Sequence, residues 1–279
     1  MIKLFVDSGS SIKQDEKAKY DVEILPLKIM LGDKEYLDGV DLSMEEFYHY
    51  LIDEKLFPKT SLPSLENADK LVKECLDNGD EVIILSFSSG LSGTYGAMKS
   101  LFADEPRVRV IDTKTAVGGI RILVDEVNKY RDQSLDFVEG KVMDLIPRIK
   151  VVAIPDTLDY LLKGGRLSRS AWVVGSILQL KPLISLDNET GKVKVIGKAF
   201  GKKRAMQSLA EYLKEFDCDE NYAIVPSYTY GKSNLDMLIS MTDPKYIPQM
   251  SECDNLDPGV ACHWGPNAFG YIFVAKKDL

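Results

Sequence analysis

Short apolar runs alternate with amphipathic stretches through the first half of the chain, and no other feature constrains the fold as strongly. Two of the stretches, Met44–Leu56 and Leu65–Leu76, place apolar residues three or four positions apart, as amphipathic helices do. Ser43 and Ser64 stand where the N-caps of these helices belong. The apolar runs, which suit strands buried on both faces, are IKLFVD (2–7), VIILSF (82–87) and VRVIDT (108–113). The repeat of strand and helix predicts a mainly parallel sheet flanked by helices, with ligand-binding loops at the carboxyl ends of the strands.

The second half of the chain has a different pattern. LISL (183–186) and KVKVIG (192–197) flank the turn-rich sequence DNETG, which is typical of a hairpin. We therefore expect a largely antiparallel sheet in this half. The other predicted elements are a helix at 202–216 and strands near 222–226 and 271–275.

This change of pattern near residue 150 predicts two domains. The chain has 279 residues, and because domains commonly have about 100 to 200 residues, the length suits two modest ones. We expect an N-terminal α/β domain over 1–150 that contains the parallel sheet. A C-terminal α/β domain with the antiparallel sheet is expected over 151–279.

The composition excludes several classes of protein. The chain has 35 Lys and Arg against 43 Asp and Glu, a formal charge of −8, so nucleic acid is an unfavourable partner. The four cysteines form no CxxC pair, and the sequence predicts neither a metal site nor a redox motif. The N-terminus lacks the features of a signal peptide, and the longest nearly uncharged stretch, 170–180, is shorter than the roughly 20 residues that span a bilayer. We expect a cytoplasmic protein without stable membrane insertion.

The segment SFSSGLSGTYGA (86–97) follows a predicted strand and opens a helix. Glycine there allows the backbone to approach a ligand closely, and a helix start presents free N–H groups to an anion. Ser92 is expected at that helix start. The segment matches neither the GxGxxG fingerprint of dinucleotide sites nor the GxSxG elbow of hydrolases. The alternative is a plain glycine-rich turn in which Ser92 only caps the helix.

TSLPS (60–64) is a second cluster of hydroxyl side chains before a helix. Pro63 restricts the residue before it to extended geometry, so Thr60 and Ser61 are held in a defined turn. The alternative interpretation is that Ser64 caps the helix and Thr60 only ends a loop.

The chain has two histidines, and they lie in different surroundings. His49 lies in the helical run EEFYHYL, where a surface or packing role is expected. His263 lies in CHWGPNAFG (262–270), which is predicted as a glycine and proline turn before a strand. We favour His263 as the functional candidate, because an imidazole with a pKa of about 6.5 can donate a hydrogen bond to an oxyanion or move a proton. A structural histidine is the alternative.

Two segments concentrate basic side chains. KGGRLSRS (163–170) places Arg166 and Arg169 after a short amphipathic stretch, and the planar guanidinium group suits a carboxylate or a phosphate. The second segment, GKKRA, contributes Lys202, Lys203 and Arg204. Solvated charge near a helix end is the alternative, and it is favoured for the two lysines.

Taken together, these segments resemble the DegV family, bacterial fatty-acid-binding proteins of the EDD fold. The resemblance covers essentially the whole chain, and it depends on the order and spacing of several short motifs. The motifs are VDSGSSI (6–12), PLKI (26–29), YLDGVDLS (36–43), TSLPS (60–64), SSGLSGTYGA (88–97), KGGRLS (163–168) and HWGPNA (263–268).

The resemblance implies a two-domain α/β fold with a fatty acid of the palmitate, stearate or oleate class in a tunnel between the domains. The ligand carboxylate is implied to bind Thr60, Ser92 and His263. The residues implied to lie around it or to face a phosphate are Ser61, Gly93 and Arg166. The apolar run at 171–180 is a candidate for the tunnel lining.

The same resemblance implies a carrier rather than an enzyme, with no cofactor or metal. The bound carboxylate is expected to be phosphorylated by a separate ATP-dependent fatty acid kinase subunit. The acyl phosphate would then pass to an acyltransferase and into phospholipid synthesis. The implied docking residues for the kinase are Arg169, Lys202, Lys203 and Arg204.

Two other functions stay open at this point. One is a serine hydrolase with Ser92 as nucleophile, His263 as base and Asp112 as the acid that orients the base. Its weakness is the missing GxSxG motif. The other, suggested by the related fold of dihydroxyacetone kinase, is a protein that binds a small carbonyl compound through His263.

Overall fold

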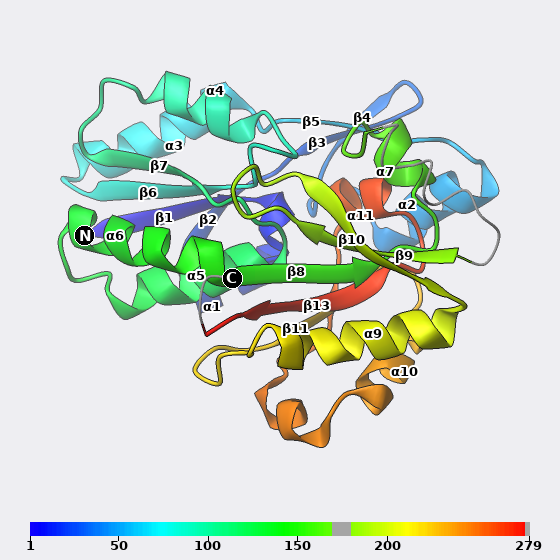
Figure 1. Cartoon of the computed structure of the whole chain (residues 1–279). Helices are drawn as coiled ribbons and strands as arrows, with labels where there is room; N and C mark the ends of the chain where they lie inside the picture. The colour runs from blue at the N-terminus through cyan, green and yellow to red at the C-terminus, as the bar shows by residue number, and fades with distance from the viewer. Residues whose placement is uncertain (169–179, 277–279) are drawn as a thin grey trace.

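The structure is a computed structural model that describes residues 1–168 and 180–276 (Figure 1). In this part of the chain the strands form three sheets, and a layer of helices separates the two largest. The α/β fold class predicted from the sequence is confirmed. Arg169, implied above as a docking residue, and all but the last residue of the run at 171–180 lie outside the described residues.

Sheet A forms from the first half of the chain, and its described strands are all parallel in the order β2–β1–β6–β7. These strands are β1 (Ile2–Asp7), β2 (Val22–Leu25), β6 (Glu81–Ser86) and β7 (Val108–Asp112). The prediction of a mainly parallel sheet is confirmed, and the three strands predicted in this half agree with β1, β6 and β7 to within one residue.

Helices cover both faces of sheet A, because successive apolar residues of its strands point to opposite faces. In β1, Leu4 and Val6 face the buried cluster that contains α5, whereas Phe5 faces α3 and α4. The helices that contact sheet A are α1 (Lys17–Tyr20), α3 (Leu65–Asp77), α4 (Thr94–Leu101), α5 (Gly118–Lys129) and α6 (Leu135–Leu145).

Serine caps begin two of the helices that the sequence predicted. Ser43 Oγ and Ser64 Oγ each accept a backbone N–H of the first helical turn, at 3.1 and 3.2 Å, so both predicted N-caps are confirmed. The first helix is shorter than predicted, since α2 (Met44–Tyr48) continues as a π-helical segment that ends at Asp53. Short 3-10 turns are present at Ser8–Ser10, Gln14–Glu16, Ile146–Arg148 and Pro244–Gln249.

Sheet C forms from the second half of the chain in the order β10–β9–β8–β13–β11–β12. Its described pairings are antiparallel except the one between β11 and β12, so the predicted antiparallel character is confirmed. The strands are β8 (Ile149–Ile154), β9 (Leu180–Leu186), β10 (Val193–Phe200), β11 (Val225–Tyr228), β12 (Asp254–Asn255) and β13 (Phe269–Val274). The predicted hairpin is β9 and β10. β11 begins three residues later than predicted, because Tyr222 N–H closes a turn onto Asp219 O at 3.3 Å.

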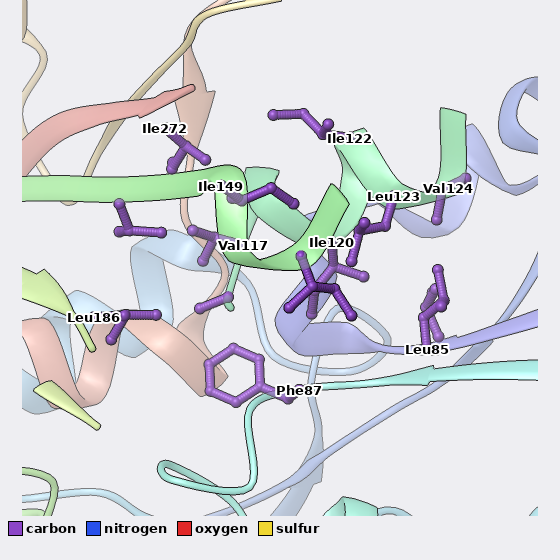
Figure 2. Close-up of a cluster of buried hydrophobic side chains, with 14 of the residues drawn as sticks. Leu85, Phe87, Val117, Ile120, Ile122, Leu123, Val124, Ile149, Leu186 and Ile272 are labelled. Carbon is purple, nitrogen blue, oxygen red and sulfur yellow. The ribbon is translucent and has the colours of Figure 1, made fainter. Parts of the chain in front are cut away.

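Helix α5 lies between sheets A and C (Figure 1). Figure 2 shows Ile120 and Leu123 of α5 in one buried cluster with Leu85 of sheet A and Ile149 of sheet C. The other face of sheet C is covered by α9 (Lys202–Glu215) and α10 (Ser233–Met241). One apolar cluster therefore draws on both halves of the chain, and their division into two domains near residue 150 stays a prediction.

A third sheet packs strands from the N-terminal half against a helix from the end of the chain. Its order is β4–β3–β5, all antiparallel, with β3 (Lys28–Leu31), β4 (Lys34–Leu37) and β5 (Lys59–Ser61). Ile29 and Phe47 share an apolar cluster with Ala261 of α11 (Pro258–Trp264), and α7 (Asp159–Lys163) also contacts α11. This packing brings β5 and α11, which are far apart in the sequence, to the same place.

Two further properties concern the described ranges as a whole. No helix within them is both long and apolar enough to cross a membrane. Within the same ranges, no group of three or more His, Cys, Asp or Glu side chains is arranged to hold a metal ion. The cytoplasmic location expected from the sequence stays a prediction.

Candidate functional site

The loops at the carboxyl ends of sheet A are joined by a buried aspartate. Asp7 ends β1, and its carboxylate accepts the N–H of Gly9 at 3.1 Å and the N–H of Phe87 at 3.0 Å. Because Phe87 follows the neighbouring strand β6, Asp7 connects the loops of the two strands. Burial raises the pKa of Asp7 to about 6, although both hydrogen bonds act in the opposite direction.

Ser92 lies on the loop after β6, shortly before α4. Its Oγ accepts the N–H of Thr94 at 3.2 Å and lies 2.9 Å from Thr94 Oγ1. Helix α4 begins at Thr94 with Gly93 as the N-cap, so the prediction that Ser92 starts the helix is wrong. The physical reason is a local turn, in which the serine side chain binds the backbone two residues on and holds Ser92 outside the helix.

Thr60, at the end of the third sheet, meets His263. Thr60 Oγ1 and His263 Nε2 are 2.9 Å apart and form a hydrogen bond across 203 sequence positions. His263 lies in the last turn of α11, so the prediction of a turn at this position is wrong. The turn begins only at Gly265, whose φ of 74° ends the helix.

The ring of His263 is held in its neutral form. Burial, and then the positive charge of Arg166, lower the pKa of His263 to about 3. Within the described residues, its Nδ1 has no hydrogen-bond partner. Gly164 packs directly against the ring, and a Cβ at that position would lie 2.2 Å from Nδ1. Gly164, the first glycine of the KGGRLS motif, is therefore required by the close approach of the imidazole.

Arg166 connects the turn after α7 with the loop that contains Ser92. Its Nε donates to Leu91 O at 2.9 Å, and its Nη1 donates to Gly164 O. The guanidinium group thus holds backbone on either side of it and places a positive charge beside His263.

These side chains line one polar cavity of about 110 Å³. Every residue that the resemblance implies at the ligand head group lies there, namely Thr60, Ser61, Ser92, Gly93, Arg166 and His263. The remaining lining residues are Leu27, Leu62, Phe87, Leu91, Gly259 and Val260. The structure brings the predicted residues together, and their role in binding a ligand stays a prediction.

A second, apolar cavity of about 20 Å³ lies where sheet C meets α11. Its lining includes Val117, Val152, Leu256, Trp264, Ala268 and Ile272. Phe87, which lines the polar cavity, belongs to the same buried cluster as Val117 and Ile272 (Figure 2). The polar cavity therefore adjoins the apolar core.

Three of the residues implied for kinase docking are described by the structure, and these three do not line the polar cavity. Those that the structure describes lie exposed on the first turn of α9; they are Lys202, Lys203 and Arg204. Arg169 lies outside the described residues. This basic turn is therefore separate from the head-group residues.

The relay that a serine hydrolase needs is not assembled in the described residues. His263 binds Thr60 rather than Ser92. Asp112 accepts the N–H of Ser89 at 3.0 Å and pairs with Lys114 at 2.8 Å, and neither contact orients an imidazole.

Sequence reasoning missed the apolar and glycine residues of the cavity lining. Phe87 is the first residue after β6, at the sheet edge where ligands bind, and that position was a usable signal. Gly259 and Val260 were missed because α11 was not recognised. Pro258 at its first turn and Gly265 after its end are the signals that could have found it.

Several known proteins are similar to this chain. The family model described as "Uncharacterised protein, DegV family" matches residues 1–276. A DegV domain-containing protein of Clostridium acetobutylicum is 31% identical over 280 residues, which cover 99% of each chain. Among solved structures, a fatty acid binding DegV family protein of Streptococcus agalactiae has a TM-score of 0.89 at 26% identity, with 99% of both chains covered. A stearic acid-binding protein of Eubacterium ventriosum has a TM-score of 0.82 at 26% identity, again with 99% of both chains covered.

The fold and the site define a layered α/β protein in which a polar cavity, at the carboxyl ends of a parallel sheet, adjoins an apolar core shared with a second sheet. The match of one family model to almost the entire chain, together with a relative above 30% identity, makes the assignment specific. The chain belongs to the DegV family.

Proposed function

We propose that the protein binds a long-chain fatty acid of the palmitate, stearate or oleate class, with its carboxylate in the polar cavity. The observation that supports this most is the 2.9 Å hydrogen bond between Thr60 and His263 at a cavity that Ser92 and Arg166 also line. Hydroxyl groups, a neutral imidazole and a guanidinium group suit an anion, and none of the described residues that line this cavity is acidic. The solved relatives whose names state fatty acid binding support the same ligand class.

The tail and the head group would contribute differently to affinity. Burial of about 14 methylene groups at about 0.8 kcal/mol each gives a gross gain of about 11 kcal/mol before the costs of ordering. A hydrogen bond to a charged group contributes about 1.5–3 kcal/mol. The tail would therefore supply most of the affinity, and the polar cavity would determine where the carboxylate lies.

The tail needs more room than the two cavities offer. Pockets that enclose a small molecule have volumes of about 300–1,000 Å³. The polar cavity has about 110 Å³ and the apolar cavity about 20 Å³. We therefore expect the apolar side chains between the two predicted domains to separate when a tail enters.

Ligand copurification and two substitutions test this proposal. Native mass spectrometry of the protein made in bacteria should show a bound fatty acid, and removal of Thr60 and Ser92 hydroxyls in a Thr60→Ala/Ser92→Ala variant should weaken palmitate binding at least about tenfold. Thr242→Ala is the matched control, because it removes a buried hydroxyl 2.8 Å from Tyr271 OH that is not part of the cavity. A protein without copurified lipid and without affinity for palmitate or oleate would contradict the proposal.

The protein would act as a carrier rather than as an enzyme. A separate ATP-dependent fatty acid kinase subunit would phosphorylate the bound carboxylate, and the acyl phosphate would pass to an acyltransferase and into phospholipid synthesis. The exposed first turn of α9 supports a docking role, and the proposed contacts are Arg169, Lys202, Lys203 and Arg204. Hydroxylamine should trap an acyl hydroxamate only when loaded protein, ATP and the kinase subunit are all present. Trapping without the kinase subunit would contradict the carrier role.

A further inference from the structure

Asp38, in the YLDGVDLS segment after β4, has a buried carboxylate that connects two distant parts of the chain. The residue is 0% exposed. Its Oδ2 accepts a hydrogen bond from Ser8 Oγ at 2.7 Å, and its Oδ1 accepts the N–H of Gly259 at 2.9 Å. Ser8 follows β1, whereas Gly259 lies in the first turn of α11. One carboxylate therefore joins the loop after the first strand to the helix that contains His263.

The directions of the hydrogen bonds around Asp38 follow from backbone donors. Leu27 N–H donates to Ser8 Oγ at 3.1 Å, so the hydroxyl proton of Ser8 is free to donate to Asp38. Asp38 N–H in turn donates to Leu27 O at 2.9 Å. Both carboxylate oxygens of Asp38 thus act as acceptors, as in the ionised side chain. Leu27 and Gly259, its two backbone partners, both line the polar cavity.

Gly259 links Asp38 to the position of His263. A Cβ at Gly259 would lie 2.3 Å from Asp38 Oδ2, so the helix approaches the carboxylate as closely as its backbone allows. His263 follows Gly259 by four positions in α11, and residues at this spacing lie on the same face of a helix about one turn apart. A shift of the first turn of α11 away from Asp38 would therefore move His263 relative to Thr60.

The charges near Asp38 do not pair with it directly. Burial, and then the negative charge of Asp257, raise the pKa of Asp38, while Ser8, Gly259 and the positive charge of Lys13 act in the opposite direction. Lys13 Nζ itself binds Asp257 at 2.7 Å. Removal of the Asp38 carboxylate therefore breaks the contact with α11 without leaving an unpaired cation.

We infer that Asp38 is a positioning residue for head-group recognition: it holds the first turn of α11 so that His263 stays in hydrogen-bond contact with Thr60 at the polar cavity. This inference rests on the proposed function, because it concerns the recognition of the same carboxylate. Asp38 itself does not line the cavity and would not touch the ligand.

The test compares palmitate with 1-hexadecanol, which has the same chain length and no carboxylate. The ratio of the two dissociation constants measures head-group recognition separately from tail burial. In Asp38→Ala we expect the preference for palmitate to fall about tenfold, with little change in the affinity for hexadecanol. Asp38→Asn should restore most of the preference, since its amide oxygen can still accept the N–H of Gly259.

Asp219→Asn is the matched control. Asp219 is a buried aspartate that binds Arg148 and Asn221, and it is not part of the cavity lining. This variant disturbs a buried carboxylate away from the cavity, and its preference for palmitate should equal that of the wild type. A merely structural role of Asp38 would give the same pattern in both variants.

The outcomes separate the two proposals. If the wild type binds neither ligand, the proposed function is wrong, and the role of Asp38 is wrong with it. If the wild type prefers palmitate and Asp38→Ala keeps or increases that preference, only the role of Asp38 is overturned. Should Asp38→Ala fail to fold, Gly259→Ala decides in its place, because its Cβ would lie 2.3 Å from Asp38 Oδ2 and would push the first turn of α11 away from the carboxylate. An unchanged preference in Gly259→Ala would overturn the inference.

Discussion

At the scale of single residues, the site depends on ionisable groups whose environment differs from water. His263 is neutral because it is buried and faces Arg166, and its pKa is lowered to about 3. Asp7 is buried at the carboxyl end of β1, and its pKa is raised to about 6. Both shifts follow from the cost of placing a charge in a low-dielectric interior. Because His263 is neutral and none of the described residues that line the cavity is acidic, Arg166 supplies the charge there, and it is positive.

The protonation of His263 should report the arrival of a carboxylate. In the free protein the ring should stay neutral from pH 7 down to about 4, because its pKa is about 3. A bound fatty acid should raise this pKa, since an anion nearby stabilises the imidazolium form. NMR titration of the two histidine rings measures this directly. His49 is the internal control, because it is exposed and its pKa is raised by Asp53, and it should not respond to the ligand.

Asp7 should make the free energy of unfolding depend on pH. The folded state binds the Asp7 proton more tightly than the unfolded state, whose pKa is near 3.8, so this contribution to stability is present below pH 4 and is lost as the pH rises to about 6. The loss is about 3 kcal/mol, from about 1.4 kcal/mol for each unit of pKa difference. Urea denaturation from pH 4 to 7 should show wild type losing this amount relative to Asp7→Asn. A difference between the two proteins that does not change with pH would contradict the prediction.

At the scale of elements, the β9–β10 hairpin supports the loop that contains Ser92. Ser88 Oγ donates to Gly191 O at 2.8 Å, which joins the loop after β6 to the tip of the hairpin. A Cβ at Gly90 would lie 2.5 Å from the backbone of Gly191 and of Thr190. Glycine at position 90 is thus required by close backbone contact between the loop after β6 and the turn between β9 and β10.

Two glycines of the same motif should respond oppositely to substitution by alanine. Gly90→Ala should lower the free energy of unfolding by about 1–3 kcal/mol, because the new methyl group meets backbone that has little freedom to move. Gly96→Ala should raise it by about 0.5–1 kcal/mol, since Gly96 lies inside α4 with open space around it and alanine favours the helix. Urea denaturation of both variants checks this. Equal changes in the two variants would show that the hairpin contact does not constrain the loop.

At the scale of the whole molecule, α5 and its cluster join the two halves of the chain. Leu85 and Ile120 come from the N-terminal half, whereas Ile149 sits at the boundary and Ile272 comes from the C-terminal half (Figure 2). A shared apolar cluster makes the unfolding of one half expose the buried surface of the other. The two predicted domains are therefore expected to depend on each other for stability.

Calorimetry should show one unfolding transition for the full chain. The calorimetric enthalpy should equal the van't Hoff enthalpy, because the shared cluster couples the two halves. Addition of palmitate should raise the transition temperature without splitting the transition, since a ligand that binds only the folded state stabilises it. Two separate transitions in the ligand-free protein would show instead that 1–150 and 151–279 unfold independently.

Much of the fold was predictable because its signals are local. Apolar runs and helical spacing located β1, β6, β7 and α3, and the caps at Ser43 and Ser64 located helix starts. The helix that contains His263 was not predicted, because α11 is short and its apolar residues give little periodicity. The motif residues were singled out one by one, with no information on the distances between them.

The pattern of residues along the chain was enough to establish the α/β class, the parallel and antiparallel sheets and the motifs of the DegV family. Periodicity, capping and turn preferences act over a few neighbouring residues, so one sequence contains them in full. Only the tertiary structure decided that Thr60 and His263, 203 positions apart, share a hydrogen bond. It also decided that Asp38 accepts the N–H of Gly259. These contacts form between segments that are far apart in the sequence, and neither segment's own sequence specifies its partner. The pKa values of His263 and Asp7 depend on the same packing, because burial shifts them.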